Sequence, residues 1–209
     1  MTILALEFSS ARRSVALARG GTLLAEAVEE TGGRGTNAFG LVEKTLKKAK
    51  ISRDEIEVIA VGLGPGSYTG IRAAIAVAQG WQLARGTKLL GVGSMASLAA
   101  QARAENIFGR VNLVVDAQRG EFYQAVWEIS GQGCVEFSPL KIVASAEIVA
   151  RQAAGETCAG PEMERILFPS AATVAALAAG RTDFLPGERL EPVYLRETSF
   201  VKAPVGQIV

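Results

Sequence analysis

The 209-residue chain contains no histidine, and this absence excludes several kinds of site at once. Ser-His-Asp triads, zinc sites with histidine ligands and acid–base catalysis by imidazole all need that side chain. The chain has only two cysteines, Cys134 and Cys158, which are too far apart for a C-x-x-C motif. Each is interpreted as a small buried hydrophobic residue or as half of a disulfide. A reducing compartment is favoured, and a peptidase function is set aside.

The chain also lacks an excess of either charge and a hydrophobic run long enough to cross a membrane. Its 22 basic and 21 acidic residues give a formal net charge of +1, so direct binding of nucleic acid is not indicated. Glu7 interrupts the N-terminal apolar stretch, which argues against a signal peptide. Residues 166–180 are broken by Pro169 and are shorter than the roughly 20 residues that span a bilayer. A soluble, cytoplasmic protein without membrane contact is therefore expected.

Two parts of the chain show the same order of predicted elements. Three strands of an antiparallel meander are predicted at residues 3–8, 14–19 and 22–30. From about residue 110 to residue 143 the pattern again reads strand, turn, strand, turn, strand. Helices are predicted after Thr36 and Asn37, from the GPGSYTG turn to Gly86, from Ser94, and at 145–154 and 170–179. The pattern predicts a duplicated α/β protein with subdomains 1–105 and 106–209 and a cleft between them.

An acidic residue closes the first predicted strand of each half, Glu7 in one and Asp116 in the other. This layout resembles the actin-like ATPase and sugar kinase (ASKHA) fold, in which two acids face the phosphates and metal of a nucleotide. Here Phe8-Ser9-Ser10 stands where a phosphate loop needs glycine, which favours ordinary strand-end carboxylates. We interpret Glu7 and Asp116 as a degenerate cleft without metal or cofactor. The alternative is an independent phosphotransferase that uses both as metal-side acids.

A glycine-rich turn, GLGPGSYTG, joins a predicted buried strand to a long helix. The residues of interest in this turn are Gly64, Gly66, Ser67, Thr69 and Gly70. A helix N-terminus preceded by glycines can bind an anion, although no lysine follows in the Walker A position. Glycine also serves a tight strand-to-helix turn by itself, and this second interpretation is favoured.

Two predicted helices carry apolar residues at helical spacing. The residues are Phe39, Val42 and Leu46 in the first helix and Ile71, Ala74, Ile75 and Ala78 in the second. Spacings of three and four place side chains on one face of a helix. Packing in the core explains such a face, and a subunit interface explains the apolar residues in excess of what a core needs. Both interpretations stay open on the residues alone.

Several blocks of the sequence, taken in order from residue 3 to about residue 196, resemble the TsaB (YeaZ) family. The blocks are ILALEFSS with SVALARGG, AVGLGPGSYTGIRAAIAVAQG, LLGVGSMASLA, VVDAQRGEFYQAVW and EPVYLRE. Relatives usually have Asp-Thr where this chain has Glu7-Phe8, a difference that leads further from a working nucleotide site.

The resemblance implies an actin-like, two-domain fold and a non-catalytic role. TsaB-like proteins pair with the related catalytic subunit TsaD and, with the ATPase TsaE, support formation of N6-threonylcarbamoyladenosine in tRNA. The resemblance therefore implies a scaffold or activator with a TsaD-like and a TsaE-like partner, and tRNA contact only through the complex. It also implies a homodimer when the chain is alone. In the family the first two long helices form the dimer surface, which favours the interface interpretation of the two apolar stripes.

Overall fold

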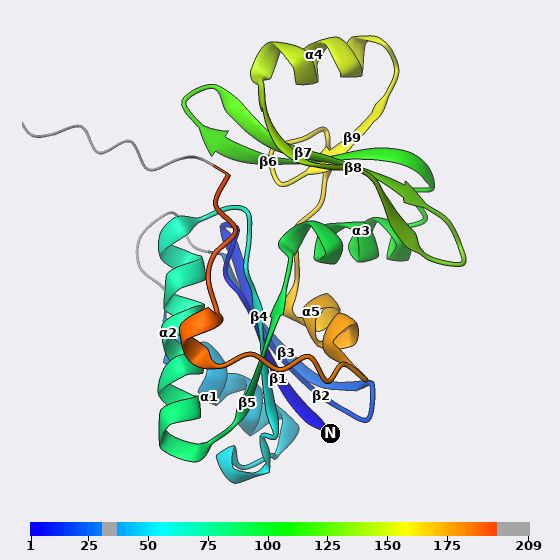
Figure 1. Ribbon diagram of the computed structural model, residues 1–209. Helices are drawn as coiled ribbons and strands as arrows, with labels where there is room; N and C mark the ends of the chain where they lie inside the picture. The colour runs from blue at the N-terminus through cyan, green and yellow to red at the C-terminus, as the bar shows by residue number, and fades with distance from the viewer. Residues whose placement is uncertain (31–36, 196–209) are drawn as a thin grey trace, which may run out of the picture.

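A computed structural model describes residues 1–30 and 37–195 as two sheets, one above the other in Figure 1. The lower, sheet A, contains β1 (Thr2–Glu7), β2 (Arg12–Arg19), β3 (Thr22–Glu30), β4 (Val58–Gly62) and β5 (Lys88–Val92). The upper, sheet B, contains β6 (Gly109–Gln118), β7 (Glu121–Ile129), β8 (Cys134–Ala144), β9 (Thr157–Gly160) and β10 (Arg165–Ile166). The strands predicted for the first meander therefore form, with bounds shifted by one or two residues.

The two sheets share one topology. Sheet A has the order β3-β2-β1-β4-β5, and sheet B has the matching order β8-β7-β6-β9-β10 when read from its other edge. In each sheet the first three strands are an antiparallel meander. The fourth strand then pairs parallel to the first, and the fifth parallel to the fourth. This repetition confirms the predicted duplicated α/β architecture of the actin-like type.

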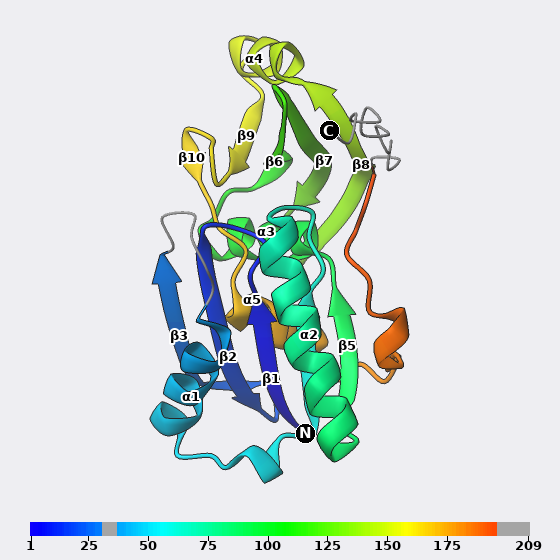
Figure 2. The same ribbon diagram turned by 90° about the vertical axis from the view of Figure 1, so that its left-hand side faces the viewer.

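Helices cover both faces of each sheet. They are α1 (Ala38–Ala49), α2 (Tyr68–Arg85), α3 (Ser94–Ala104), α4 (Ser145–Ala153) and α5 (Ala171–Ala178), with short 3-10 turns η1 (Arg53–Glu55) and η2 (Gly187–Arg189). Figure 2 shows α1 and α2 on the near face of sheet A and α5 behind it. Helices α3 and α4 cover the two faces of sheet B. Each half is thus a sandwich of helix, sheet and helix.

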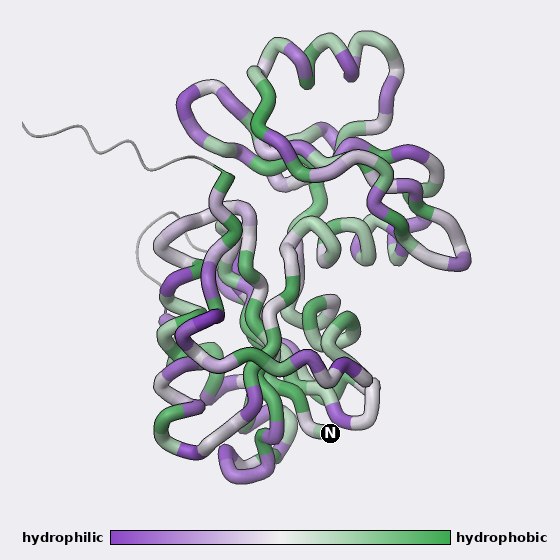
Figure 3. Tube along the Cα trace, viewed as in Figure 1, coloured by the Kyte–Doolittle hydropathy of each residue, from purple (hydrophilic) through white to green (hydrophobic). Residues whose placement is uncertain are grey.

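Alternation along the strands builds two apolar layers on sheet A. Leu4 and Leu6 of β1 pack toward α1 and α2, whereas Ile3 and Ala5 pack toward α5. Because successive side chains of a strand point to opposite faces, a strand covered on both faces must be apolar throughout. The hydrophobic colour of the central strands and of α5 in Figure 3 reflects this double cover. Within the described ranges, none of the helices is long and apolar enough to span a membrane.

Two helices pack on the sheet that belongs to the other half of the chain, as divided at the predicted subdomain boundary. Helix α3 precedes residue 105, yet its Leu98 packs with Leu113 of sheet B. Helix α5 belongs to the second half of the chain, yet its Val174 packs with Ile3 of sheet A. The two helices meet where the Ser170 amide donates to the Ser97 hydroxyl at 3.1 Å. The division at residue 105 stays a prediction, and the packing adds that each sheet is covered partly by a helix from the other half of the sequence.

Helix ends follow local signals in the sequence. The Asn37 side chain accepts a hydrogen bond from the Gly40 amide, as its prediction as a cap requires, whereas Thr36 lies outside the described residues. Helix α2 ends at Gly86, which has a φ of +67°. Helix α3 begins at Ser94, as predicted, and its N-cap residue is Gly93, which makes no side-chain cap hydrogen bond. The Ser94 hydroxyl is therefore free for a different bond.

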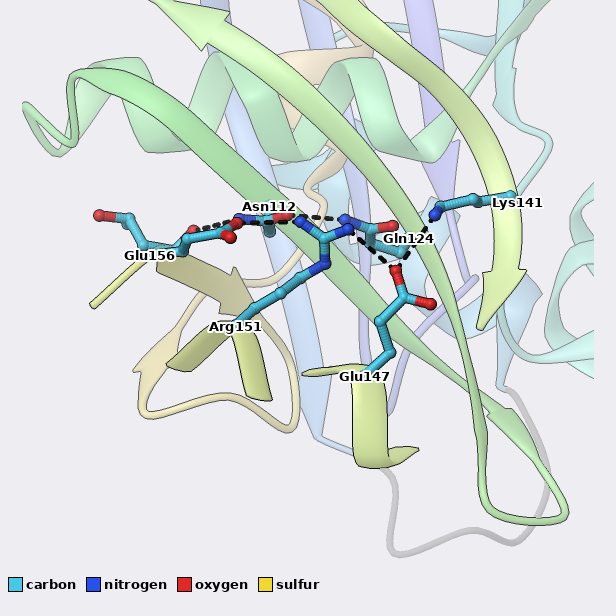
Figure 4. A network of polar contacts seen from close by, with 7 residues as sticks. Asn112, Gln124, Lys141, Glu147, Arg151 and Glu156 are labelled. Atoms are coloured by element: carbon cyan, nitrogen blue, oxygen red, sulfur yellow. Dashed lines mark hydrogen bonds and ion pairs between the residues drawn. The ribbon is translucent and has the colours of Figure 1, made fainter. Parts of the chain in front are cut away.

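A polar network ties α4 to the outer face of sheet B (Figure 4). The buried Asn112 and Gln124 are joined by a 2.6 Å hydrogen bond, and Asn112 also donates to Glu156. Arg151 bridges Glu156 to Glu147 of α4. These bonds satisfy the Asn112 side chain and the Gln124 amide nitrogen, which would otherwise be costly to bury, and through Glu156 and Arg151 they position α4. Nearby, Cys158 is a free thiol, as is Cys134, so the alternative of a disulfide between them does not hold.

Candidate functional site

The glycine-rich turn between β4 and α2 packs against the segment that follows β1. A Cβ on Gly66 would lie 2.1 Å from the Ser9 carbonyl oxygen, and one on Gly70 would lie 2.0 Å from the Phe8 carbonyl oxygen. The Ser67 amide donates to the Ser9 carbonyl at 2.6 Å. Backbone carbonyls of the same chain therefore occupy the space that these glycines open. The glycines therefore allow the turn to pack closely against the backbone of Phe8 and Ser9, and this backbone occupies the place where a ligand would approach.

Two further residues of the predicted turn have identifiable roles. Gly64 has a φ of +88°, which favours glycine. The Ser67 side chain caps α2 by accepting from the Gly70 amide at 3.3 Å, while Thr69 lies exposed in the first turn of the helix.

Glu7 is fully buried and serves as a structural acceptor. Its carboxylate accepts one hydrogen bond from the Ser9 amide and one from the Ser94 hydroxyl, both 2.8 Å long. The Ser94 hydroxyl in turn accepts from the Gly64 amide at 3.1 Å. Burial raises the pKa of Glu7 above its ordinary value, although these hydrogen bonds oppose the shift. Sequence reasoning did not identify Ser94 as a partner, because no local pattern connects it with Glu7.

Asp116 lies in a different environment, at a cavity of about 640 Å³ between the two halves. The Asp116 carboxylate accepts from the Gln118 amide at 2.7 Å. Glu162 lies beside it, and burial together with the charge of Asp116 raises the pKa of Glu162. The residues that line this cavity include Asp116 but not Glu7. The structure therefore does not bring the two predicted cleft acids together, because Glu7 lies beneath the Ser9 turn rather than at the cavity wall.

The described residues hold no group of three or more His, Cys, Asp or Glu side chains that could bind a metal ion. Among the described residues, one cationic side chain, that of Arg119, and two carboxylates, those of Asp116 and Glu162, line the cavity. Paired carboxylates without further ligands do not make the oxygen cage that a divalent ion requires.

The predicted interface residues require a correction, because six of the seven lie in the core. The buried residues are Val42, Leu46, Ile71, Ala74, Ile75 and Ala78, which pack with the strands of sheet A. Helical spacing identified the apolar faces of both helices, but it could not show that these faces point at the sheet. Phe39 alone is accessible, with 69% of its surface exposed. The interface stays a prediction, and of the seven residues only Phe39 and Val42 line the groove described next.

A shallow apolar groove of about 320 Å³ lies between α1 and α2 on their outer side. We call it the α1–α2 groove; its lining residues are Phe39, Val42, Glu43, Arg53, Ala76, Val77, Gly80, Trp81 and Ala84. Leu83 follows on the same helix with 89% of its surface exposed. The charged residues nearby are paired within the chain, Glu43 with Arg53 and Asp54 with Arg85. An apolar centre with charged groups at its edge is the usual anatomy of a protein–protein interface.

Comparisons with known proteins agree with this architecture. Residues 36–182 match the family model described as "TsaD: tRNA N6-adenosine threonylcarbamoyltransferase". The chain is 29% identical to the tRNA threonylcarbamoyladenosine biosynthesis protein TsaB of Escherichia coli, over 94% of this chain and 95% of the relative. It is 30% identical to the Bacillus subtilis protein of the same name, over 61% of this chain and 56% of the relative. Among solved structures, YeaZ from Pseudomonas aeruginosa superimposes with a TM-score of 0.78 at 29% identity, covering 93% of this chain and 99% of that one.

Proposed function

The chain belongs to the TsaB (YeaZ) family, within the wider family that the TsaD model describes, and from this membership we propose its function. It is a non-catalytic partner subunit in the biosynthesis of threonylcarbamoyladenosine in tRNA. The α1–α2 groove receives a TsaD-like catalytic subunit, and a TsaE-like ATPase completes the assembly. Without its partner the chain forms a homodimer through the same groove, and it meets tRNA only as part of the complex.

The exposed Gly80 of α2 is the main observation that supports the α1–α2 groove as the docking site. It lies on the exposed side of α2, it has no positive φ, and a Cβ built on it would meet nothing within 4 Å. Glycine inside a helix costs about 1 kcal/mol relative to alanine, and this chain by itself gains nothing in return. A helix of another subunit that packs closely on α2 accounts for the missing side chain.

The neighbours of Gly80 support the same interpretation. Ala76 and Ala84 lie one turn before and one turn after it, so three small residues line one side of the groove. Such a surface allows two helix axes to approach at the close end of the ~8–10 Å packing range. Phe39 projects at the other side of the groove as an exposed aromatic anchor.

The buried position of Glu7 supports the non-catalytic part of the proposal. Ser9 and Ser94 engage its carboxylate, and burial favours its neutral form. A metal-side acid of a phosphotransferase must instead be charged and open to the cleft. Of the two acids that the alternative phosphotransferase would use, Glu7 and Asp116, only Asp116 lines the cavity.

Co-purification with the TsaD-like protein of the same organism tests the proposal. In Gly80→Leu the added side chain fills the groove, while the isolated chain stays folded because leucine favours a helix. We expect this variant to lose the partner, and the modification activity of the reconstituted system to fall to the level measured without this chain. Ala150→Leu is the matched control, since it adds similar bulk to an exposed position of α4.

The experiment distinguishes an error in the docking surface from an error in the partner-subunit role. If Gly80→Leu still co-purifies and supports full activity, the docking surface lies elsewhere on the chain. If the wild-type chain adds nothing to the modification activity of its TsaD-like protein, the partner-subunit role itself is wrong. Sedimentation of the isolated wild-type chain and of Gly80→Leu tests the homodimer in the same way.

A further inference from the structure

An aromatic and arginine cluster lies at the N-terminal end of the exposed face of α2. Tyr68 and Tyr194 have ring centroids 5.6 Å apart, and 54% and 51% of their surfaces are exposed. The Arg72 guanidinium lies 5.0 Å from the centre of the Tyr68 ring and donates to the Tyr68 hydroxyl. Ala76 of the α1–α2 groove follows Arg72 by one helical turn. The cluster is therefore continuous with the groove along α2.

The cluster is held in place from two sides. Tyr68 and Arg72 belong to a helix that is packed on sheet A, and the backbone next to Tyr194 is fixed because the Val193 amide donates to the Leu63 carbonyl at 2.9 Å. The Tyr68 hydroxyl also shares a hydrogen bond with Tyr194. An arginine oriented in this way loses less freedom on binding than a mobile one.

Arg72 differs from the other exposed arginine of its helix in the charge that faces it. Arg85 forms an ion pair with Asp54 inside the chain. Arg72 has no ion pair with any residue of 1–30 or 37–195, and the partners it does have there, the side chains of Tyr68 and Tyr194, are neutral phenols. Its positive charge is therefore oriented, exposed and uncompensated within this part of the molecule.

We propose that Arg72 is a specificity-determining contact that receives a carboxylate side chain of the catalytic partner when the partner's helix lies in the α1–α2 groove. The inference rests on the proposed function and adds a charged contact to an otherwise apolar surface. A guanidinium binds a carboxylate with two parallel hydrogen bonds, so it fixes the register of a partner helix as well as attracting it.

An unpaired RNA base is the other occupant that two tyrosines and an arginine could suggest. The geometry disfavours it, because Arg72 already lies against the Tyr68 ring and Tyr194 is tilted by 41° toward the same ring. A base needs an open aromatic face on which to stack. The formal net charge of +1 also provides little attraction for a polyanion.

Calorimetric titration of this chain with its TsaD-like protein at low and high salt tests the proposal. We expect Arg72→Gln to weaken binding at least ~10-fold at low salt and to flatten the dependence of affinity on salt. Arg72→Lys keeps the positive charge but loses the two parallel donors of the guanidinium, so its affinity should fall between those of wild type and Arg72→Gln. Tyr68→Phe removes the hydroxyl that orients the guanidinium and should weaken binding by a smaller factor. Arg110→Gln is the matched control, since it removes an exposed arginine of sheet B that does not line the groove, and it should bind like wild type.

Four outcomes decide whether Arg72 makes this contact. Binding that is weakened in Arg72→Gln and lost in Gly80→Leu supports the carboxylate contact. Wild-type affinity in Arg72→Gln together with loss in Gly80→Leu overturns it and leaves the groove in place, whereas wild-type affinity in both variants overturns the groove as well. If Arg72→Gln binds the partner normally but weakens tRNA binding by the assembled complex, the cluster is an RNA contact and the proposal is wrong.

Discussion

The Ser94 hydroxyl donates a 2.8 Å hydrogen bond to the Glu7 carboxylate, although 87 positions separate the two residues in the sequence. The same hydroxyl accepts from the Gly64 amide, so one serine joins the end of β1, the glycine turn and the start of α3. Glu7, the acid at the end of β1, is therefore part of the protein interior. The bond explains why Glu7 does not line the cavity that contains Asp116.

Glu7→Gln should remove a pH dependence of stability. Burial raises the folded-state pKa of Glu7 above the ordinary value of 4.5, so the folded chain keeps a proton that the unfolded chain releases. The contribution of Glu7 to stability therefore falls as pH rises from about 4.5 toward the folded-state pKa. Urea unfolding of both proteins between pH 5 and pH 8 should show Glu7→Gln gaining relative to wild type as pH rises. A difference that stays constant across this range contradicts the prediction.

Valine at Gly70 should destabilise the fold. Its Cβ would lie 2.0 Å from the Phe8 carbonyl oxygen, and neither the helix start nor β1 can move without losing packing. We expect a loss of about 1–3 kcal/mol, measured by urea unfolding. Gly66→Val should behave alike, because Ser9 blocks its side chain and its φ is +146°. Gly93→Val is the control, since a Cβ at Gly93 meets nothing within 4 Å. Unchanged stability in both turn variants would show that the glycines are incidental.

A charge should act differently on the buried and the exposed side of the two helices. Ala74 is fully buried, so Ala74→Glu places an unpaired carboxylate in the core and should cost about 3 kcal/mol or more. Phe39→Glu changes a side chain that is 69% exposed and should leave the melting temperature nearly unchanged while weakening partner binding. Melting curves and the calorimetric titration check both statements. A normal melt for Ala74→Glu contradicts the placement of α2 on sheet A.

ATP should bind the isolated chain no better than ~1 mM, which corresponds to roughly −4 kcal/mol. At the start of α2 the Ser67 amide already donates to the Ser9 carbonyl, so a backbone group suited to a phosphate is engaged within the chain. Calorimetry with ATP and Mg²⁺ is the measurement, and micromolar binding would refute the interpretation of the cleft as degenerate.

Regular periodicity made the fold predictable, whereas contacts between distant residues did not follow from the sequence. The apolar strands and the Asn37 cap are local signals, and each appears in the structure. The apolar stripe that contains Ala74 was found correctly, but a stripe has the same spacing whether it faces a sheet or a partner. Gly80 could have been singled out from the sequence as a glycine in the middle of a helix, yet its exposure was needed to give it a meaning.

The exchange of α3 and α5 between the two sheets has a consequence for synthesis on the ribosome. Residues 1–92 emerge with every strand of sheet A, but the face formed by Ile3 and Ala5 has no cover until α5 has been translated. The nascent chain must therefore carry an open apolar surface while sheet B is being made. Completion of the first half waits for the second, and the two halves reach their final state together.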